Sequence, residues 1–342
     1  MYEQFFGLRE RPFDLTPNPR FLVMTDGHRE ALSNLEYAIA SRKGVALLLG
    51  EAGSGKTTVI RAAVAQQTSR VHCVHLHNPA LTRNEFVEML AARFELSDDA
   101  RRSKTTLLLE MESLLEKRYE TQEATVLIVD EAQSLSTELL EEIRLLANIE
   151  TSEEKLLTLV IAGQPELGMK LDDPSLRQLK QRIALRCELR PLTLHETLLY
   201  LAGRIRAAGG VTSRIFTREA ATLLHQTAAG IPRTINVLAD NALLAAFARQ
   251  QSPVTSQTVT EVVRDFRIDA DGTSAVRRPD DGLLLGTEPA NGTNGGGPAS
   301  TASVGVAGTT VPGPGDTHGK GLLASLAGKT RRFAFPGRKG IE

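Results

Sequence analysis

The sequence predicts an α/β domain built on an open, mostly parallel sheet, followed by an all-helical domain and a disordered, low-complexity tail. Short apolar runs alternate with longer helical stretches through the first 190 residues. Strand-like runs cease after Pro191, where only helical patterns continue. After Ile268 the composition changes to Gly, Ala, Thr, Ser and Pro, with too few large apolar side chains to form a core. We therefore divide the chain into 1–190, 191–268 and 269–342.

Five short apolar runs are the predicted strands of the first domain. Helices cover both faces of a parallel sheet, so its strands are continuously apolar rather than alternating. The runs begin at Val45, Val71, Thr125, Leu156 and Ile183. Between them, helical spacing and helix-forming residues predict helices at 31–42, 57–67, 84–93, 106–119 and 138–150.

The second domain is predicted to contain only helices, at 196–208, 217–229, 232–249 and 256–266. Residues with known terminal preferences separate them. Thr217 suits an N-cap, Gly230 suits the C′ position, which requires a positive φ, and Pro232 suits a first helical turn.

The overall charge is balanced, with 40 Lys and Arg against 41 Asp and Glu. No field of either sign would therefore draw the whole molecule onto nucleic acid or an anionic membrane. The N-terminal residues lack the unbroken apolar core of a signal peptide, so we expect a cytoplasmic protein. Residues 320–340 interleave Leu and Phe with Lys and Arg, a pattern that could contact a partner or the inner-membrane surface. A solvated basic tail is the alternative that we favour.

The segment from Gly50 to Thr57, GEAGSGKT, matches the pattern GxxxxGK[ST] in full, between a predicted strand and a predicted helix. Glycines let backbone N–H groups turn inward around phosphates, and the positive end of the helix dipole faces them. Lys56 would contact the β- and γ-phosphates, and the hydroxyl of Thr57 would bind Mg²⁺. The predicted ligands of ATP in this segment are Gly50, Glu51, Ala52, Gly53, Ser54, Gly55, Lys56, Thr57 and Thr58.

Two acidic residues follow the strand at Thr125, in LIVDEAQ. Asp130 and Glu131 would lie at the carboxyl end of that strand, where open parallel sheets bind ligands. Asp130 would hold Mg²⁺ through water, while Glu131 would orient and deprotonate the attacking water.

Two amides follow other strands and are further candidates. Asn78 could hydrogen-bond Glu131 and hold it inactive until a partner binds, or it could be a turn residue before Pro79. Gln164, in VIAGQPEL, would place its amide near the γ-phosphate or the attacking water.

Three arginines could neutralise charge during phosphoryl transfer, because a guanidinium matches phosphate oxygens. Arg177 and Arg182 precede the last strand, from where a side chain could reach the nucleotide of a neighbouring subunit. Arg182 is our first choice and Arg177 the alternative, with surface ion pairing left open for both. Arg233, at the start of a helix in the second domain, could contact the γ-phosphate of its own subunit.

These residues, in this order, resemble the AAA+ ATPases of the ExeA/GspA (general secretion pathway-associated) type. The likeness covers about residues 1–268 and includes MYEQFFGLRERPFDLTPNPRFL, LVIAGQPEL, LRQLKQRI, LRPLTLHET and GIPRTINVLADNALLAAF. It implies that Asp130 and Glu131 are the Walker B pair and Gln164 the sensor 1 position. It further implies that Arg182 or Arg177 is the arginine finger and Arg233 sensor 2.

The resemblance implies a homo-oligomeric ATPase that serves an envelope secretion or surface-assembly system. Family members that act on the cell wall carry a membrane span and a peptidoglycan-binding domain after the ATPase, and neither is recognisable here. Envelope attachment would then require the tail or a membrane-bound partner. The alternative function is a DNA-associated AAA+ switch, although no basic reading element follows Phe266.

Overall fold

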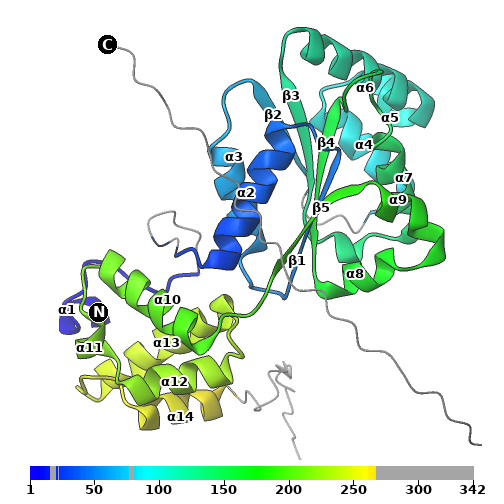
Figure 1. Ribbon diagram of the computed structural model, residues 1–342. Coiled ribbons are helices and arrows are strands. Elements are labelled where there is room, and N and C mark those ends of the chain that lie inside the picture. The colour runs from blue at the N-terminus through cyan, green and yellow to red at the C-terminus, as the bar shows by residue number, and fades with distance from the viewer. Residues whose placement is uncertain (16–20, 22, 77–80, 267–342) are drawn as a thin grey trace, which may run out of the picture. The chain divides into compact units, whose positions relative to one another are not determined.

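The computed structural model describes residues 1–15, 21, 23–76 and 81–266. The predictions for Asn78 and for 269–342 lie outside these residues. The α/β domain contains one five-stranded sheet in the order β2-β3-β4-β1-β5, with every neighbouring pair parallel (Figure 1). The predicted parallel sheet and its five strands are confirmed: β1 Val45–Gly50, β2 Val71–Leu76, β3 Ala124–Val129, β4 Leu157–Gly163 and β5 Ile183–Leu189.

The strand register brings three loops to one edge of the sheet. Leu49 near the end of β1 pairs with Gly163 at the end of β4. Val129 at the end of β3 pairs with Ile161 of β4. Because parallel strands share a direction, the segments after β1, β3 and β4 begin side by side at the carboxyl edge.

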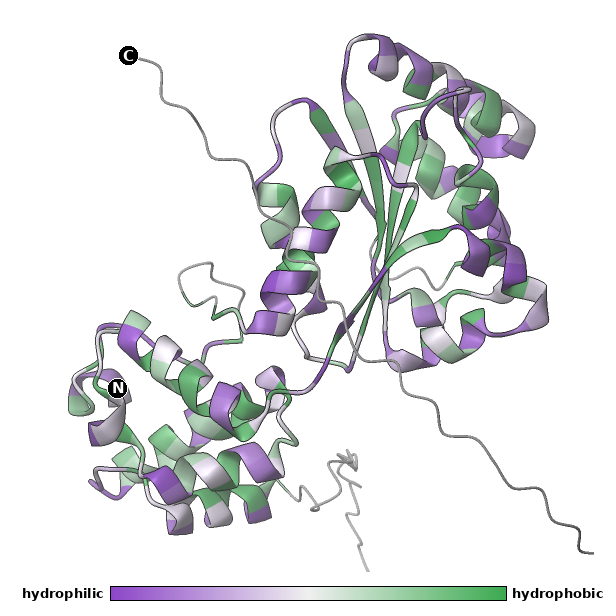
Figure 2. Cartoon of the chain, in the orientation of Figure 1, coloured by the Kyte–Doolittle hydropathy of each residue, from purple (hydrophilic) through white to green (hydrophobic). Residues whose placement is uncertain are grey.

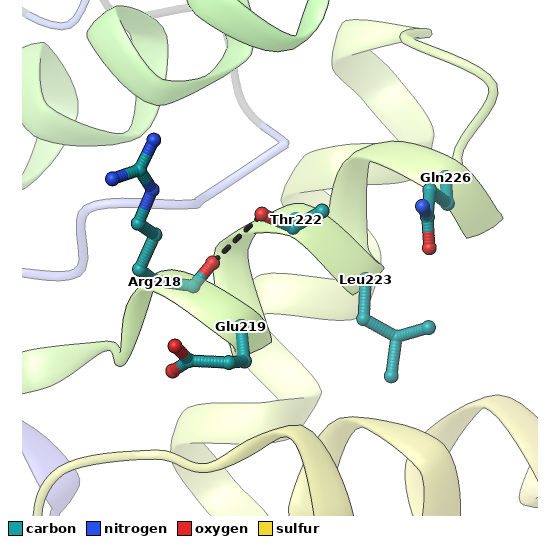
Figure 3. Close-up of a pocket in the computed structure, with 5 residues that line it drawn as sticks. All are labelled: Arg218, Glu219, Thr222, Leu223 and Gln226. Carbon is teal, nitrogen blue, oxygen red and sulfur yellow. Dashed lines mark hydrogen bonds between the residues drawn. The ribbon is translucent and has the colours of Figure 1, made fainter.

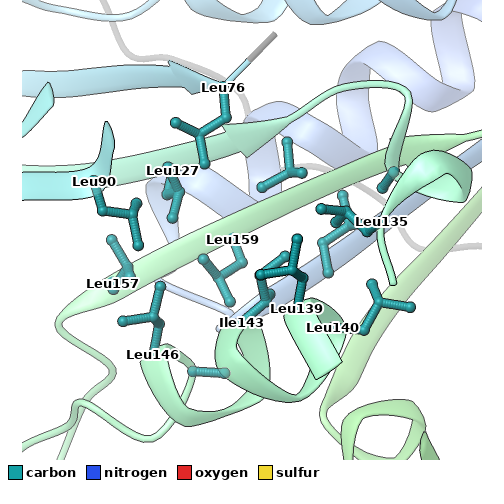
Figure 4. Close-up of a cluster of buried hydrophobic side chains, with 14 of the residues drawn as sticks. Leu76, Leu90, Leu127, Leu135, Leu139, Leu140, Ile143, Leu146, Leu157 and Leu159 are labelled. Atoms are coloured by element: carbon teal, nitrogen blue, oxygen red, sulfur yellow. The ribbon is translucent and has the colours of Figure 1, made fainter. Parts of the chain in front are cut away.

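Helices cover both faces of the sheet, which explains its apolar strands (Figure 1). Alternate strand residues point to opposite faces: Ala46 and Leu48 join one buried cluster, while Leu47 and Leu49 join the other. Figure 4 shows part of the second cluster, and Figure 2 shows its strands as mostly hydrophobic. The first cluster contains residues of α2 (Asp26–Ala40) and α3 (Lys56–Ala65). The second contains residues of α4 (Arg83–Arg93), α5 (Asp98–Arg102), α6 (Lys104–Glu120), α7 (Thr137–Leu146), α8 (Pro165–Leu171) and α9 (Arg177–Gln181).

Between β5 and residue 266, every helix or strand that the structure describes is a helix, as predicted: α10 Leu194–Ala207, α11 Thr212–Ile215, α12 Arg218–Thr227, α13 Pro232–Ala248 and α14 Ser256–Asp265. The Thr217 hydroxyl accepts a 3.1 Å hydrogen bond from the Ala220 amide at the start of α12. Gly230 has a φ of 73°, and Pro232 is the first residue of α13. The sequence did not predict α11, because a single turn shows no periodicity.

The N-terminal segment contributes its apolar side chains to the core of these helices. It begins with α1 (Tyr2–Phe5), and its buried residues are Tyr2, Phe6, Leu8, Phe13 and Phe21. They share one hydrophobic cluster with α10 to α14. The packing of this segment therefore joins the first residues of the chain to the helices that follow β5. The domain boundary at residue 190 stays a prediction.

Arg204 of α10 fastens the N-terminal segment by several contacts. Its Nε donates to the Pro12 carbonyl at 2.5 Å, and Nη2 donates to the Asp14 carbonyl at 3.1 Å. Nη1 donates to the Tyr200 hydroxyl at 2.8 Å, and the guanidinium carbon lies 5.4 Å from the centre of the Phe21 ring. The buried charge is thus surrounded by oxygen acceptors and aromatic faces.

Candidate nucleotide-binding site

The loop between β1 and α3 has the backbone geometry that its glycines permit. Gly53 and Gly55 have φ values of 82° and 105°, which residues other than glycine rarely adopt. Gly55 is the residue before α3, so the first amides of that helix face the loop. Successive amides in such turns form a concave donor surface that binds anions.

Lys56 lies beneath the loop with only 4% of its surface exposed. Its Nζ donates to the carbonyls of Gly50 at 2.8 Å and Glu51 at 3.1 Å. Burial lowers the pKa of Lys56, while the nearby carboxylates of Glu131 and Asp130 oppose that shift. The ammonium group is therefore held among oxygen atoms at the centre of the candidate site.

Thr57 joins the loop to the acidic pair. Its Oγ1 donates a 2.7 Å hydrogen bond to Oδ2 of Asp130, which follows β3 and is buried. Oδ1 of Asp130 accepts a 3.0 Å hydrogen bond from the Glu131 amide. Hydroxyl and carboxylate oxygens are the hard ligands that Mg²⁺ prefers, so this pair fits the predicted metal.

Glu131 has a left-handed backbone, with φ of 55° and ψ of 37°, and its side chain contacts Gln133. Nε2 of Gln133 donates to Oε2 of Glu131 at 2.6 Å, and Oε1 of Gln133 accepts from the backbone N–H of Gln164 at 3.1 Å. Gln133 thus connects two residues that the sequence predicted to be close. The role of Gln133 was not predicted from the sequence, because a single glutamine in a short 3-10 turn carries no spacing signal of its own.

His28, near the start of α2, also contacts the loop and was missed. Its Nε2 lies 2.9 Å from the Ser54 carbonyl, and its Nδ1 lies 2.7 Å from the Thr25 hydroxyl. A carbonyl only accepts, so Nε2 carries the hydrogen and Nδ1 accepts from Thr25. Burial lowers the pKa of His28, which favours the neutral ring.

Arg233 reaches the loop through its backbone. Its amide donates to the Gly53 carbonyl at 3.3 Å, and a Cβ added at Gly53 would lie 2.6 Å from the Arg233 Cβ. The start of α13 therefore adjoins the loop, as a nucleotide contact from Arg233 requires.

The structure does not bring the two finger candidates to this cluster. Arg177 is exposed at the start of α9, and Nη1 of Arg182 donates to the Gln178 carbonyl at 3.2 Å. Within the described residues, no hydrogen bond or ion pair joins either arginine to the loop.

One group at the loop lacks a hydrogen-bonding partner. The Ser54 hydroxyl oxygen is buried and has no partner within the described residues. A phosphate oxygen would supply the missing acceptor. Together with the amides of the loop and Lys56, this orphan hydroxyl fits the predicted triphosphate.

Away from the loop, α12 carries a recess of about 310 Å³, which is lined by Arg218, Glu219, Thr222, Leu223 and Gln226 (Figure 3). Thr222 Oγ1 donates to the Arg218 carbonyl at 2.9 Å within the helix. No predicted site residue lines this recess, so it offers no support for a further catalytic centre. Among the described helices, none is long and apolar enough to cross a membrane.

Comparison with known proteins identifies the domain. The AAA domain family matches residues 39–171, which include the loop, the acidic pair and Gln164. General secretion pathway protein A of Aeromonas hydrophila is 43% identical over 249 residues, covering 73% of this chain and 45% of that protein. The chain thus spans less than half of this relative.

Solved structures support the fold. ORC2 of Aeropyrum pernix has a TM-score of 0.54 at 18% identity, covering 75% of this chain and 71% of that one. A Walker-type ATPase of Pyrococcus abyssi has a TM-score of 0.52 at 20% identity, covering 74% and 76%. At such identities the likeness concerns the fold alone. The AAA-domain match and the 43% identity over 73% of this chain show that it belongs to the AAA+ P-loop family of the general secretion pathway protein A type.

Proposed function

We propose that the chain hydrolyses ATP with Mg²⁺ and, as a homo-oligomer, drives or switches a bacterial envelope secretion or surface-assembly system. The observation that carries the ATPase proposal is the hydrogen bond between Thr57 and Asp130. It joins the phosphate-binding loop to the acidic residues after β3, so one site holds both the means to bind phosphates and the means to activate water.

Each residue has a distinct task in this proposal. The amides of residues 50–58 and the Lys56 ammonium bind the phosphates, and Thr57 and Asp130 hold Mg²⁺. Bound Mg²⁺ neutralises charge on the phosphate oxygens. Glu131 takes a proton from the attacking water as the bond to the γ-phosphorus forms and the β–γ anhydride bond breaks. Gln164 orients that water, and Arg233 senses the γ-phosphate.

Two observations support the oligomer and its pathway. Arg177 is exposed at the start of α9, Arg182 bonds to the Gln178 carbonyl, and within the described residues neither arginine bonds to its own loop, which suits a task in a neighbouring subunit. The relationship to general secretion pathway protein A supports a secretion partner. We place the protein in the cytoplasm, where a membrane-bound partner would bring it to the inner membrane, and we keep the solvated basic tail as the favoured role of residues 320–340.

Lys56→Ala and Glu131→Gln test the ATPase proposal. Lys56→Ala should lose binding of a fluorescent ATP analogue, because no other ammonium lies beneath the loop within the described residues. Glu131→Gln should bind ATP normally but release phosphate more slowly by a factor of at least about 10², because the base is lost while the binding groups remain. Lys117→Ala, an exposed lysine of α6, is the control and should match the wild type.

Undiminished binding by Lys56→Ala, or normal phosphate release by Glu131→Gln, would contradict the assigned site. The pathway is tested by identifying proteins that copurify with Glu131→Gln in the presence of ATP. An envelope assembly component is the expected result. Salt-dependent retention of residues 1–268 on duplex DNA would instead favour the DNA-associated alternative.

A further inference from the structure

The amide of Gln133 uses both of its ends at the candidate site. Its Nε2 donates to Oε2 of Glu131 at 2.6 Å, and its Oε1 accepts from the backbone N–H of Gln164 at 3.1 Å. If the side-chain amide were flipped, its oxygen would face the carboxylate of Glu131 and its NH₂ group would face the backbone N–H of Gln164. The hydrogen-bond network therefore fixes the orientation of this side chain.

The backbone and the carboxylate of Glu131 are held by different groups. Its amide donates to Asp130 at 3.0 Å, and its carbonyl accepts from the Ser134 hydroxyl at 2.8 Å. Within the described residues, the carboxylate has one hydrogen bond, the one from Gln133. Among the described residues, Gln133 therefore supplies the hydrogen bond that orients the carboxylate.

The end of β4 is shaped to admit the Gln133 amide. A Cβ added at Gly163 would lie 3.0 Å from Oε1 of Gln133 and 2.6 Å from Cδ2 of Leu167. A side chain at this position would displace one or both groups. The absence of a Cβ at Gly163 thus leaves space for the hydrogen bond between Gln133 and the next residue, Gln164.

We propose that Gln133 is a positioning residue that aims the carboxylate of Glu131 and couples it to the end of β4. Gln133 itself touches no reacting atom; it acts through Glu131, and so the inference rests on the proposed ATPase function. A shift of Gln164 when phosphate binds or leaves would move the rigid amide, and the amide would turn Glu131 with it. The proposal thereby assigns a task to a residue outside the phosphate-binding motif.

Gln133→Met tests the proposal, because methionine has a similar length and lacks both hydrogen-bonding groups. Turnover at saturating ATP should fall about 10- to 100-fold, the cost expected when a reacting group is misplaced. The dissociation constant for ATP should not change, because Gln133 contacts none of the phosphate-binding groups. Gln67→Met removes a comparable 2.8 Å side-chain hydrogen bond, to the Ala63 carbonyl, and should keep wild-type turnover.

A double-mutant cycle separates positioning from a general structural effect. In single-turnover measurements, Gln133→Met should cause no further loss once Glu131 is replaced by Gln, because the group being aimed is gone. Gly163→Ala would place a methyl group at the end of β4, 3.0 Å from Oε1 of Gln133. This variant should also lower turnover while the affinity for ATP stays unchanged. It serves as the second variant should Gln133→Met fail to fold.

Wild-type turnover in Gln133→Met, or fully additive losses in the cycle, would overturn the inference and leave the ATPase proposal standing. Equal losses of turnover and ATP affinity would also overturn it, since they would indicate collapse of the site. Absence of hydrolysis by the wild-type protein would overturn both proposals.

Discussion

His28 lies on the helix before β1, and its imidazole supports the loop after β1 from outside the motif. The neutral ring satisfies the Ser54 carbonyl and the Thr25 hydroxyl at once. Protonation would add a hydrogen to Nδ1, and the Thr25 hydroxyl would then rotate and accept that hydrogen bond instead of donating it. Burial of the ring, rather than the loss of a hydrogen bond, therefore opposes the charged form.

Protonation of His28 should lower the stability of the fold. Burial holds the pKa of His28 below its unfolded value of about 6.5, so the unfolded chain binds the proton more readily. The stabilising contribution is complete above about pH 6.5 and is lost as the pH falls through that value toward the folded pKa. His28→Gln, which keeps a donor and an acceptor, should show a smaller loss of unfolding free energy between pH 7.5 and 5.5 in urea titrations.

His195→Gln is the control for this measurement, because His195 is exposed. It should keep the pH dependence of the wild type. His225 also has a pKa lowered by burial, and it adds a dependence of the same sign that both variants retain. An unchanged slope in His28→Gln would show that protonation of His28 does not limit the stability of the loop.

The sequence predicted the site where its signals are local. The phosphate-binding residues follow one another in a fixed spacing, and the acidic pair directly follows a buried strand. Gln133 and His28 bond to partners 31 and 26 residues away, and no spacing rule connects them. Only the register of the sheet and the placement of α2 bring these groups together.

At the scale of elements, β1, β3 and β4 were the most predictable part, because burial on both faces leaves a continuous apolar run. The short helices α5, α8, α9 and α11 were not predicted. Helices this short are unstable in isolation and form through tertiary packing, so their sequences carry little periodicity. The attachment of α1 to the helical core was likewise hidden, because its partners lie after residue 190.

Further along the N-terminal segment, Arg204 of α10 donates hydrogen bonds to the carbonyls of Pro12 and Asp14. Arg204→Leu should lower the free energy of unfolding by about 2–3 kcal/mol, because two backbone carbonyls and the Tyr200 hydroxyl lose a charged donor. Denaturant titration monitored by circular dichroism measures the change. Arg206→Leu, an exposed change on the same helix, should cost far less. Equal effects of the two variants would mean that the contacts of Arg204 are not what stabilises the segment.

At the scale of the whole molecule, a site shared between subunits predicts rescue by mixing. Arg182→Ala alone should lower turnover by about 10³-fold, the usual contribution of an arginine finger. Adding Lys56→Ala protein should restore part of the phosphate release. Each Lys56→Ala subunit still offers Arg182 to a neighbour whose loop is intact.

Arg177→Ala, tested in the same mixtures, decides between the two arginines. The variant that is rescued identifies the finger. If neither variant regains activity, the arginines act within their own subunit or only support the fold. Mixing wild type with Lys56→Ala gives the baseline for poisoning by inactive subunits.

The packing of the N-terminal segment also dictates an order of events during synthesis. Pro12 bonds to Arg204, 192 positions later, and the α/β domain lies between them. At about 5–20 residues per second, the ribosome needs about 10–40 s to translate this interval. During this interval the aromatic side chains of the N-terminal segment have no helical core to pack against, while the strands of the sheet can already pair. The helical core can therefore close only after the strands of the sheet have been synthesised, and a bulky fusion at Met1 would interfere with the packing of the helices rather than with the sheet.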